Sequence, residues 1–393
     1  FMKKLVSLLA LVLVVSGLAA CSAEEEDLAD TIKIGVNLEL TGDVSVYGIP
    51  ERNAIEQATE EINAAGGIDG KLVELVVYDN AYDQAKAVQN TEKLIEDGVV
   101  AILGPATSGM TLASAPLAKD NEIVVFTPSG TSSAVTLDGK VVNNWVFRSC
   151  FIDEFQGQVL ANFASNELQA KKAIVMVNGG SEYSKELARV FEEKFTSNGG
   201  SVVQQATYAD ADTDYKASLT AIAAEDFDVL FIADYAKNAG LIIGQARSTA
   251  GLETVNIIGP DGFEDSKLND LAGGAQNVNN VFFSTHFSTL SDDTQVADFV
   301  ASHKAFTLKT YGKEEVPNAL TALAYDAAYM LFKAIDNADS TEPAAIRDAL
   351  EALESFDGVT GDISFDELHN AVKPAFLIEL SNGAPVKATI VNP

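Results

Sequence analysis

The sequence has few of the residues on which disulfide, metal and nucleic-acid chemistry depend. Its 393 residues include two cysteines and three histidines. Basic residues are also few, 26 against 57 acidic ones, so the formal net charge is −31. Such an acidic chain repels phosphate backbones and anionic membrane surfaces, which excludes nucleic acid as a partner. Most of the acidic side chains are expected to lie on the solvated surface.

Several catalytic signatures are absent as well. Gly104 and Gly109 are spaced as in a phosphate-binding loop, but Met110 stands where that loop needs lysine. No Gly-x-Gly-x-x-Gly follows the first predicted strand, and no Gly-x-Ser-x-Gly elbow is present. The histidines are isolated, without a His-Glu-x-x-His zinc motif. We therefore expect no catalytic residue, no metal and no cofactor, and a protein that is not an enzyme.

The first thirty residues form a recognisable targeting segment. Met2-Lys3-Lys4 precedes an apolar run over residues 5–15, and Leu18-Ala19-Ala20-Cys21 follows. This order is typical of a secretory signal, and the run is shorter than the roughly 20 apolar residues of a spanning helix. Leu-Ala-Ala-Cys resembles the bacterial lipobox, which implies cleavage before Cys21 and a diacylglycerol on its thiol. We expect a signal peptide over 1–20 and an acidic tether over 21–30 that holds the protein to the outer face of the cell membrane.

Lipidation of Cys21 would leave Cys150 as the second and last cysteine of the mature chain. An intrachain disulfide is then impossible, and stability must come from packed cores. No histidine lies near Cys150 in sequence, so we expect a small buried residue there instead of a reactive thiol.

The rest of the chain alternates short apolar runs with helical patterns. Strands are predicted over 32–36, 72–77, 99–103, 123–126, 173–177, 202–207, 229–233 and 256–258. Helices are predicted over 50–63, 82–97, 110–120, 155–168, 183–198, 215–225 and 237–250. Three C-terminal helices over 294–311, 319–337 and 341–353 precede short strands over 361–365, 375–380 and 387–391. This alternation predicts α/β lobes with parallel sheets that are covered on both faces.

Polar loops follow two of the predicted strands. Thr107-Ser108 comes after the strand at 99–103, and a Ser/Thr-rich stretch over 127–133 comes after the strand at 123–126. Ligands of open α/β sheets bind at this edge, where hydroxyl groups and backbone N–H groups suit a carboxylate. Helix caps and turn residues would produce the same composition, so on residue type alone both interpretations stay open.

A set of motifs then runs in order along nearly the whole mature chain. These motifs are Ile34–Gly42, Tyr47-Gly48, Glu61–Gly70, Gly104–Ser108, Thr127–Thr131, Gly259–Phe263, Ala322–Ala327 and Gly358–Gly361. They resemble those of the branched-chain amino-acid (leucine/isoleucine/valine) binding proteins of ABC importers, and of their lipid-anchored Gram-positive members most. The resemblance implies a type I periplasmic-binding-protein fold, in which two Rossmann-like lobes joined by a multi-strand hinge close on one ligand.

The resemblance also implies roles for particular residues. The ligand carboxylate would be held by the hydroxyls of Ser108 and Thr131 and by backbone N–H groups near Ser129 and Thr131. The ligand ammonium would be held by Asp261. Aromatic walls would come from Tyr47, Tyr183 and Tyr235. The complete predicted set is Tyr47, Thr107, Ser108, Ser129, Gly130, Thr131, Tyr183, Tyr235 and Asp261. Whether Asp153, Glu154 or Gln156 contacts the ligand stays open.

The chain departs from the best-known Gram-negative relatives in two places. Asp261 stands where they carry Glu, and Ser129-Gly130 replaces small apolar residues. Because the Asp side chain is shorter than that of Glu, the ligand ammonium must come closer or a water must bridge the gap.

An amino acid is expected as the ligand, with an aliphatic amide or urea as the alternative. A ligand-sensing module and an extracellular enzyme are weaker alternatives, because no DNA-binding, signalling or nucleophile motif supports them.

The predicted domains follow an interrupted chain order. Lobe one comprises residues 31–148 and 284–357, and lobe two comprises residues 149–283 and 358–393. The resemblance implies a monomer whose partners are a small amino acid and the transmembrane subunits of an ABC permease, with the membrane contacted through the lipid on Cys21.

Overall fold

Two sheets organise residues 31–393, the part of the chain that the computed structural model describes. The predicted signal peptide, Cys21 and the tether lie outside these residues. The first sheet has the parallel order β2-β1-β3-β4-β7. Its strands are β1 (Ile32–Leu38), β2 (Val73–Asp79), β3 (Ala101–Leu103), β4 (Val124–Thr127) and β7 (Val146–Arg148). We call this sheet and the helices packed on it lobe one.

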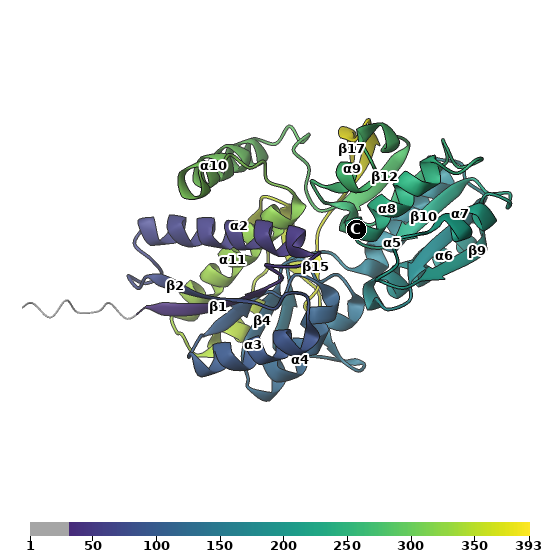
Figure 1. Cartoon of the computed structure of the whole chain (residues 1–393). Coiled ribbons are helices and arrows are strands. Elements are labelled where there is room, and N and C mark those ends of the chain that lie inside the picture. Colours follow the sequence, from purple (N-terminus) through teal and green to yellow (C-terminus); the bar gives the residue numbers. More distant parts are fainter. Residues whose placement is uncertain (1–30) are drawn as a thin grey trace, which may run out of the picture. The chain divides into compact units, whose positions relative to one another are not determined.

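Five helices pack on the first sheet. They are α2 (Ser45–Ala64), α3 (Gln84–Glu96), α4 (Ser108–Asp120), α11 (Ala319–Ala338) and α12 (Pro343–Glu351). Figure 1 shows α2 and α11 on one face of the sheet and α3 and α4 on the other. A further helix, α10 (Thr294–Tyr311), joins this lobe through a small cluster that contains Phe287, Phe299 and Ala322. Because α11 packs directly against α2, the chain returns to lobe one after building the second sheet.

The second sheet has the order β17-β16-β12-β11-β10-β8-β9, with β16 and β17 antiparallel to their neighbours. Its strands are β8 (Lys172–Asn178), β9 (Ser201–Tyr208), β10 (Val229–Ala233), β11 (Asn256–Gly259), β12 (Val281–Thr285), β16 (Ala375–Ser381) and β17 (Ala384–Val391). Its helices are α5 (Asp153–Asn166), α6 (Glu182–Ser197), α7 (Lys216–Ile222), α8 (Ala236–Arg247) and α9 (Leu268–Leu271). One core forms beneath α5 and α6, and another beneath α7, α8 and α9. We call this part lobe two.

Short elements complete the description. They are β5 (Leu137–Asp138), β6 (Val141–Val142), β13 (Phe356–Gly358), β14 (Gly361–Phe365), β15 (Ala371–Val372), and the 3-10 turns η1 (Ser133–Thr136), η2 (Asp261–Phe263) and η3 (Ala275–Asn277). The predicted fold class is confirmed: central strands such as β10 and β12 are buried along their whole length, as in a sheet covered on both faces.

Local sequence explains where several helices begin. Asp83, Ser181 and Asp293 each accept a hydrogen bond from a backbone N–H in the first turn of α3, α6 and α10. Asn318 and Thr321 form a reciprocal capping box at the start of α11. These side chains satisfy N–H groups that have no partner within the helix, typically worth about 1 kcal/mol each.

A buried polar network lies around Lys373, Thr360 and Asp326. The Lys373 ammonium contacts the Thr360 hydroxyl and lies 3.4 Å from the Ser149 carbonyl. Asp326 accepts hydrogen bonds from the Val359 and Thr360 amides at 2.8 and 3.0 Å. Burial lowers the pKa of Lys373 to about 8, and the carboxylate of Asp326 opposes that shift. The hinge is therefore held by charged groups that water does not reach.

The residues around the hinge refine the predicted lobe boundaries. Ser284, predicted in lobe one, lies in β12 of the second sheet. Ile363 and Ala371, predicted in lobe two, belong to the core of lobe one, because β14 and β15 pack beneath its sheet while the chain crosses only afterwards. Cys150, in the first crossing, is fully buried and unpaired, as predicted.

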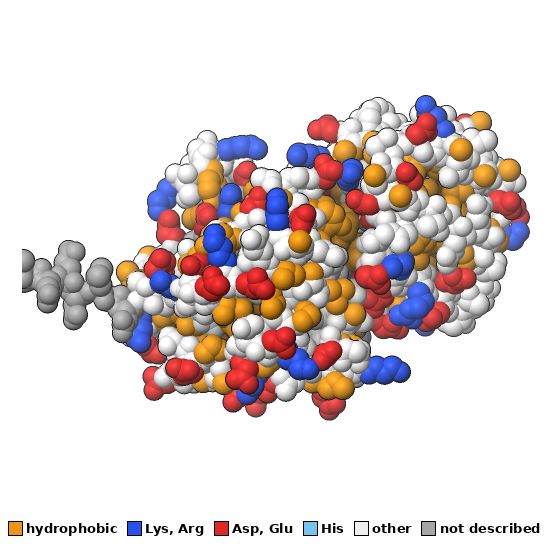
Figure 2. Space-filling model, turned by 60° about the horizontal axis from the view of Figure 1, so that its bottom comes forward, with side chains coloured by type: hydrophobic (Ala, Val, Ile, Leu, Met, Phe, Trp, Pro, Cys, Tyr) orange, Lys and Arg blue, Asp and Glu red, His pale blue; other side chains and the backbone are white. Residues whose placement is uncertain are grey.

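Acidic and basic side chains are interspersed on the face of the molecule shown in Figure 2, without a single-sign patch. Among residues 31–393, no helix combines the length and the apolar character that a membrane span requires.

Candidate functional site

A small, partly open cavity lies where the carboxyl edges of the two sheets meet. Its volume is about 20 Å³, which is room for about one water molecule. The lining residues are Tyr47, Ala106, Thr107, Ser129, Tyr183, Tyr235, Asp261, Gly262 and Leu320. Six of the nine residues predicted from the sequence are among them. Ser108, Gly130 and Thr131 are buried in the adjoining loops and do not line the cavity.

Three tyrosines form the aromatic wall. The rings of Tyr183 and Tyr235 stack with centroids 4.7 Å apart, and Tyr47 lies 5.4 Å from Tyr235. The Tyr47 hydroxyl, carried by lobe one, donates to the Gly262 carbonyl at 2.7 Å and accepts from the Ala236 amide at 3.0 Å. Both partners belong to lobe two, so Tyr47 links the lobes directly above the cavity.

Asp261 lies at the lobe-two end of the cavity and is surrounded by donors. Its Oδ1 accepts from the Tyr183 hydroxyl at 2.5 Å and from Gln156 Nε2 at 3.1 Å. Its Oδ2 lies 3.0 Å from His286 Nε2. Burial lowers the pKa of His286 to about 4, so the ring is neutral at pH 7 and Nε2–H donates to Asp261. This geometry fixes the carboxylate while its remaining lone pairs can accept from a ligand.

Gly262 allows this arrangement because it has no side chain. A Cβ at this position would lie 2.9 Å from the Tyr183 hydroxyl and 3.0 Å from the Asp234 carbonyl. The Gly262 amide also donates to the Tyr183 hydroxyl at 2.9 Å. The Gly259–Phe263 motif thus brings Tyr183 and Asp261 into contact.

Buried carboxyl groups stand behind the lobe-one hydroxyls of the cavity. The Thr107 hydroxyl and amide donate to Glu39 at 2.6 and 3.0 Å, and the Ser129 hydroxyl donates to Glu51. Burial raises the pKa of Glu39, and it raises that of Glu51 well above its usual range. The Ser129 hydroxyl also lies 2.8 Å from the Ala106 carbonyl, so acceptors within lobe one engage both hydroxyls.

The groups predicted to donate to a ligand carboxylate follow Thr107 and Ser129 in the same two loops, outside the lining of the cavity. The Ser108 hydroxyl accepts from the Ser132 amide at 3.1 Å and keeps its own proton for another acceptor. The Thr131 amide donates to no other described residue. Gly130 is confined by packing, because a Cβ there would lie 2.8 Å from the Thr127 hydroxyl. These loops can therefore supply an anion with hydroxyl and amide donors.

Several residues of the site were not predicted from the sequence. Leu320, in the first turn of α11, lines the cavity although it is distant in sequence from the other lining residues. His286 and Glu51 were also missed, and Gln156 had been left open. Glu39 was a usable signal for the site, because an acidic residue directly after the buried strand β1 lies at the sheet edge where ligands bind.

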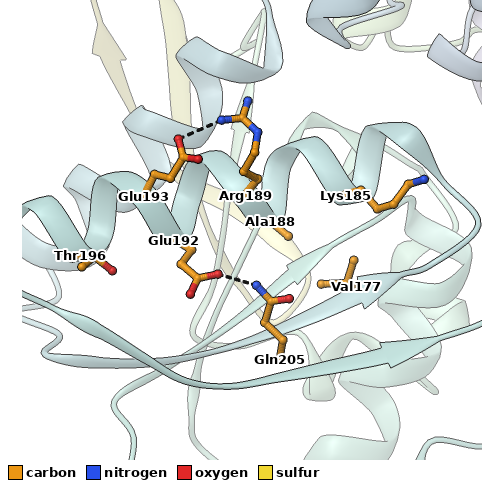
Figure 3. A pocket seen from close by; sticks show the side chains of 8 residues that line it. All are labelled: Val177, Lys185, Ala188, Arg189, Glu192, Glu193, Thr196 and Gln205. Carbon is orange, nitrogen blue, oxygen red and sulfur yellow. Dashed lines mark hydrogen bonds and ion pairs between the residues drawn. The ribbon is translucent and has the colours of Figure 1, made fainter.

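A second hollow lies apart from this site, between α6 and β9 (Figure 3). It is lined by Val177, Lys185, Ala188, Arg189, Glu192, Glu193, Thr196 and Gln205. Arg189 pairs with Glu193 at 2.9 Å, and Gln205 donates to Glu192 at 2.6 Å. These polar side chains satisfy one another at the surface, and no residue of the predicted site is among them.

The groups around this cavity match both charges of a small zwitterion. A carboxylate faces it from lobe two, the Ser108 hydroxyl and the Thr131 amide lie in the adjoining loops of lobe one, and tyrosine rings with Leu320 supply apolar surface. Two α/β lobes that close on such a cavity define a two-lobed solute-binding protein.

The comparisons with known proteins agree with that class. The chain belongs to the periplasmic binding protein family, whose family model matches residues 31–385. It is 30% identical over 350 residues to the Leu/Ile/Val-binding protein BraC3 of Rhizobium johnstonii, covering 88% of this chain and 90% of the relative. The resemblance inferred from the motifs is therefore confirmed.

Solved structures extend the comparison. The substrate-binding protein LivJ of a branched-chain amino acid transporter from Streptococcus pneumoniae, in complex with isoleucine, is 35% identical, with a TM-score of 0.85 over 92% of this chain and all of that one. The leucine-binding protein LivK of Thermotoga maritima is 32% identical, with a TM-score of 0.83 over 92% of this chain and 99% of that one.

Proposed function

We propose that the protein is an extracellular solute-binding lipoprotein that captures a branched-chain aliphatic amino acid and delivers it to an ABC permease. It binds its ligand without chemical turnover, acts as a monomer and needs no cofactor. The relatives support this proposal, since LivJ is a transporter component in complex with isoleucine. The lipid on Cys21 would hold it to the outer face of the cell membrane, in the periplasm if the cell is Gram-negative.

The observation that carries the proposal is the polarity of the cavity. Asp261, at the cavity, would receive an ammonium group, while the Ser108 hydroxyl and the Thr131 amide in the adjoining loops would receive a carboxylate. Tyr235 and Leu320 would face the aliphatic side chain. An aliphatic amide or urea has no ammonium group and would leave Asp261 without a ligand partner. We therefore assign the nine predicted residues to amino-acid binding.

We further propose that the lobes divide at three crossings, near Ser149, Thr285 and Lys373. Tyr47 and the hinge residues would move with these crossings as the lobes open and close around the ligand.

Calorimetric titration tests the function. The protein is unfolded and refolded to remove any carried ligand, then titrated with leucine, isoleucine, valine, alanine and phenylalanine, and with an aliphatic amide and urea as controls. Tight one-to-one binding of a branched amino acid, recovered chemically unchanged, is the expected result. Heat from the amide or urea alone would contradict the proposal. Loss of membrane attachment in Cys21→Ala would support the anchor.

A further inference from the structure

The loop that follows β4 in lobe one has two different sides. On one side, the buried guanidinium of Arg148 donates from Nη1 to the carbonyls of Gly130 at 2.8 Å and Ser132 at 2.9 Å. All peptide bonds of this loop are trans. In a trans peptide the C=O and the N–H point in opposite directions. The amides of Thr131 and Ser133 therefore point away from Arg148, toward lobe two.

The second of these outward amides already binds a carboxylate. The Ser133 amide lies 3.2 and 3.0 Å from the two carboxylate oxygens of Glu186, and the Ser132 hydroxyl donates to the same carboxylate at 2.6 Å. Glu186 belongs to α6 of lobe two, so these are contacts between lobes.

The same helix carries a residue of the ligand cavity. Tyr183 precedes Glu186 by one turn of α6, and its hydroxyl donates to Asp261 at 2.5 Å. Residues three apart lie on the same face of a helix. One face of α6 therefore reaches the ammonium end of the cavity through Tyr183 and the carboxylate end through Glu186.

We propose that Glu186 is a positioning residue that couples lobe closure to the geometry of the ligand-carboxylate loop. The inference rests on the proposed function and deepens it. The loop presents two outward amides separated by one residue, of which Thr131 serves the ligand carboxylate and Ser133 serves Glu186. The positive charge of Arg148, on the other side of the loop, compensates the two neighbouring anions. When lobe two swings away, the loop loses Glu186 and the ligand loses its fixed donors, so opening and release occur together.

Dissociation kinetics test this proposal. Release of radiolabelled isoleucine into excess unlabelled ligand is measured for wild type, Glu186→Ala and Glu186→Gln. Glu186→Ala is expected to release isoleucine roughly tenfold faster, the scale of one charge-assisted hydrogen bond, with little change in the association rate. Glu186→Gln, which keeps one acceptor oxygen but no charge, should fall between the two.

Glu193→Ala is the matched control. It removes the same charge from the same helix, but Glu193 pairs with Arg189 at the second hollow, between α6 and β9 (Figure 3). It should release isoleucine at the wild-type rate. Equal release rates for Glu186→Ala and Glu193→Ala would overturn the proposal. So would a lowered melting temperature of Glu186→Ala without faster release, because that pattern indicates a purely structural role.

Small-angle X-ray scattering of the ligand-free protein separates failure of this proposal from failure of the proposed function. The contact between Glu186 and Ser133 needs no ligand, so Glu186→Ala should be more open, with a larger radius of gyration than wild type and Glu193→Ala. A larger radius supports Glu186 as the closure contact even if wild type binds no isoleucine. An unchanged radius would refute it.

Discussion

Replacing Asp261 by Asn is the sharpest test of the ligand orientation. The change keeps the size of the side chain and removes the charge that would face an ammonium group. The Asp261 side chain is only 11% exposed, so solvent screens the lost interaction weakly. A charge-assisted hydrogen bond is worth about 1.5–3 kcal/mol. At about 1.4 kcal/mol for each factor of ten, affinity for isoleucine should fall roughly ten- to a hundredfold.

Asp261→Asn also affects the neighbours of the carboxylate. Tyr183, Gln156 and His286 all donate to Asp261, and the new amide group cannot accept from all three. Calorimetry of the variant should therefore be accompanied by a thermal melt. Asp270→Asn, on the exposed surface of α9, makes the same charge change away from the cavity and should bind like wild type.

A ligand without its amino group completes the test. The analogue 3-methylpentanoic acid retains the carboxylate and the aliphatic chain of isoleucine. If Asp261 pairs with the ammonium, wild type and Asp261→Asn should bind this analogue with similar affinity. A variant that binds isoleucine as tightly as wild type, or loses equal affinity for both compounds, would refute the assigned orientation.

Three further changes test other contacts. Tyr47→Phe leaves the Gly262 carbonyl and the Ala236 amide without their partner, so calorimetry should show roughly ten-fold weaker binding. Gly262→Ala brings a methyl group to 2.9 Å from the Tyr183 hydroxyl and should abolish binding in the same assay. Burial lowers the pKa of His286 to about 4 in the folded protein, against an ordinary value of 6.5. The unfolded chain therefore binds the proton first as pH falls, and wild type loses up to about 3 kcal/mol between pH 6.5 and 4. His286→Gln should flatten this dependence in urea unfolding.

Each of these changes has an outcome that would contradict its reasoning. Wild-type affinity in Tyr47→Phe would show that its hydroxyl does not stabilise the closed form. Normal binding by Gly262→Ala would mean that the motif tolerates a side chain. An identical pH slope for wild type and His286→Gln would show that His286 titrates normally.

The sequence predicted the fold and much of the cavity because both depend on local patterns. Buried strands alternate with helices, and polar residues follow those strands at the edge where ligands bind. The prediction of Asp261 and the tyrosines depended on their places within motifs. The strand β12 was missed, since a five-residue apolar run does not by itself distinguish a strand from a buried helical segment.

The residues that were missed are those whose roles depend on distant contacts. Leu320 reaches the cavity only because α11 returns to lobe one. His286 and Glu51 act through partners far away in sequence, so no spacing indicates them. The Ser129 hydroxyl likewise contacts an acid carried by another element.

The interrupted chain order bears on how the protein is made and exported. The strands of the first sheet all lie within residues 32–148, but α11 and α12, which pack on it, come only after residue 318. A chain that emerges from its N-terminus first thus exposes the apolar face of this sheet until most of lobe two has followed. Lobe two, whose cores are largely contiguous in sequence, needs shorter loop closures. Lobe two is thus expected to fold first, and lobe one depends on protection from aggregation until its last helices arrive.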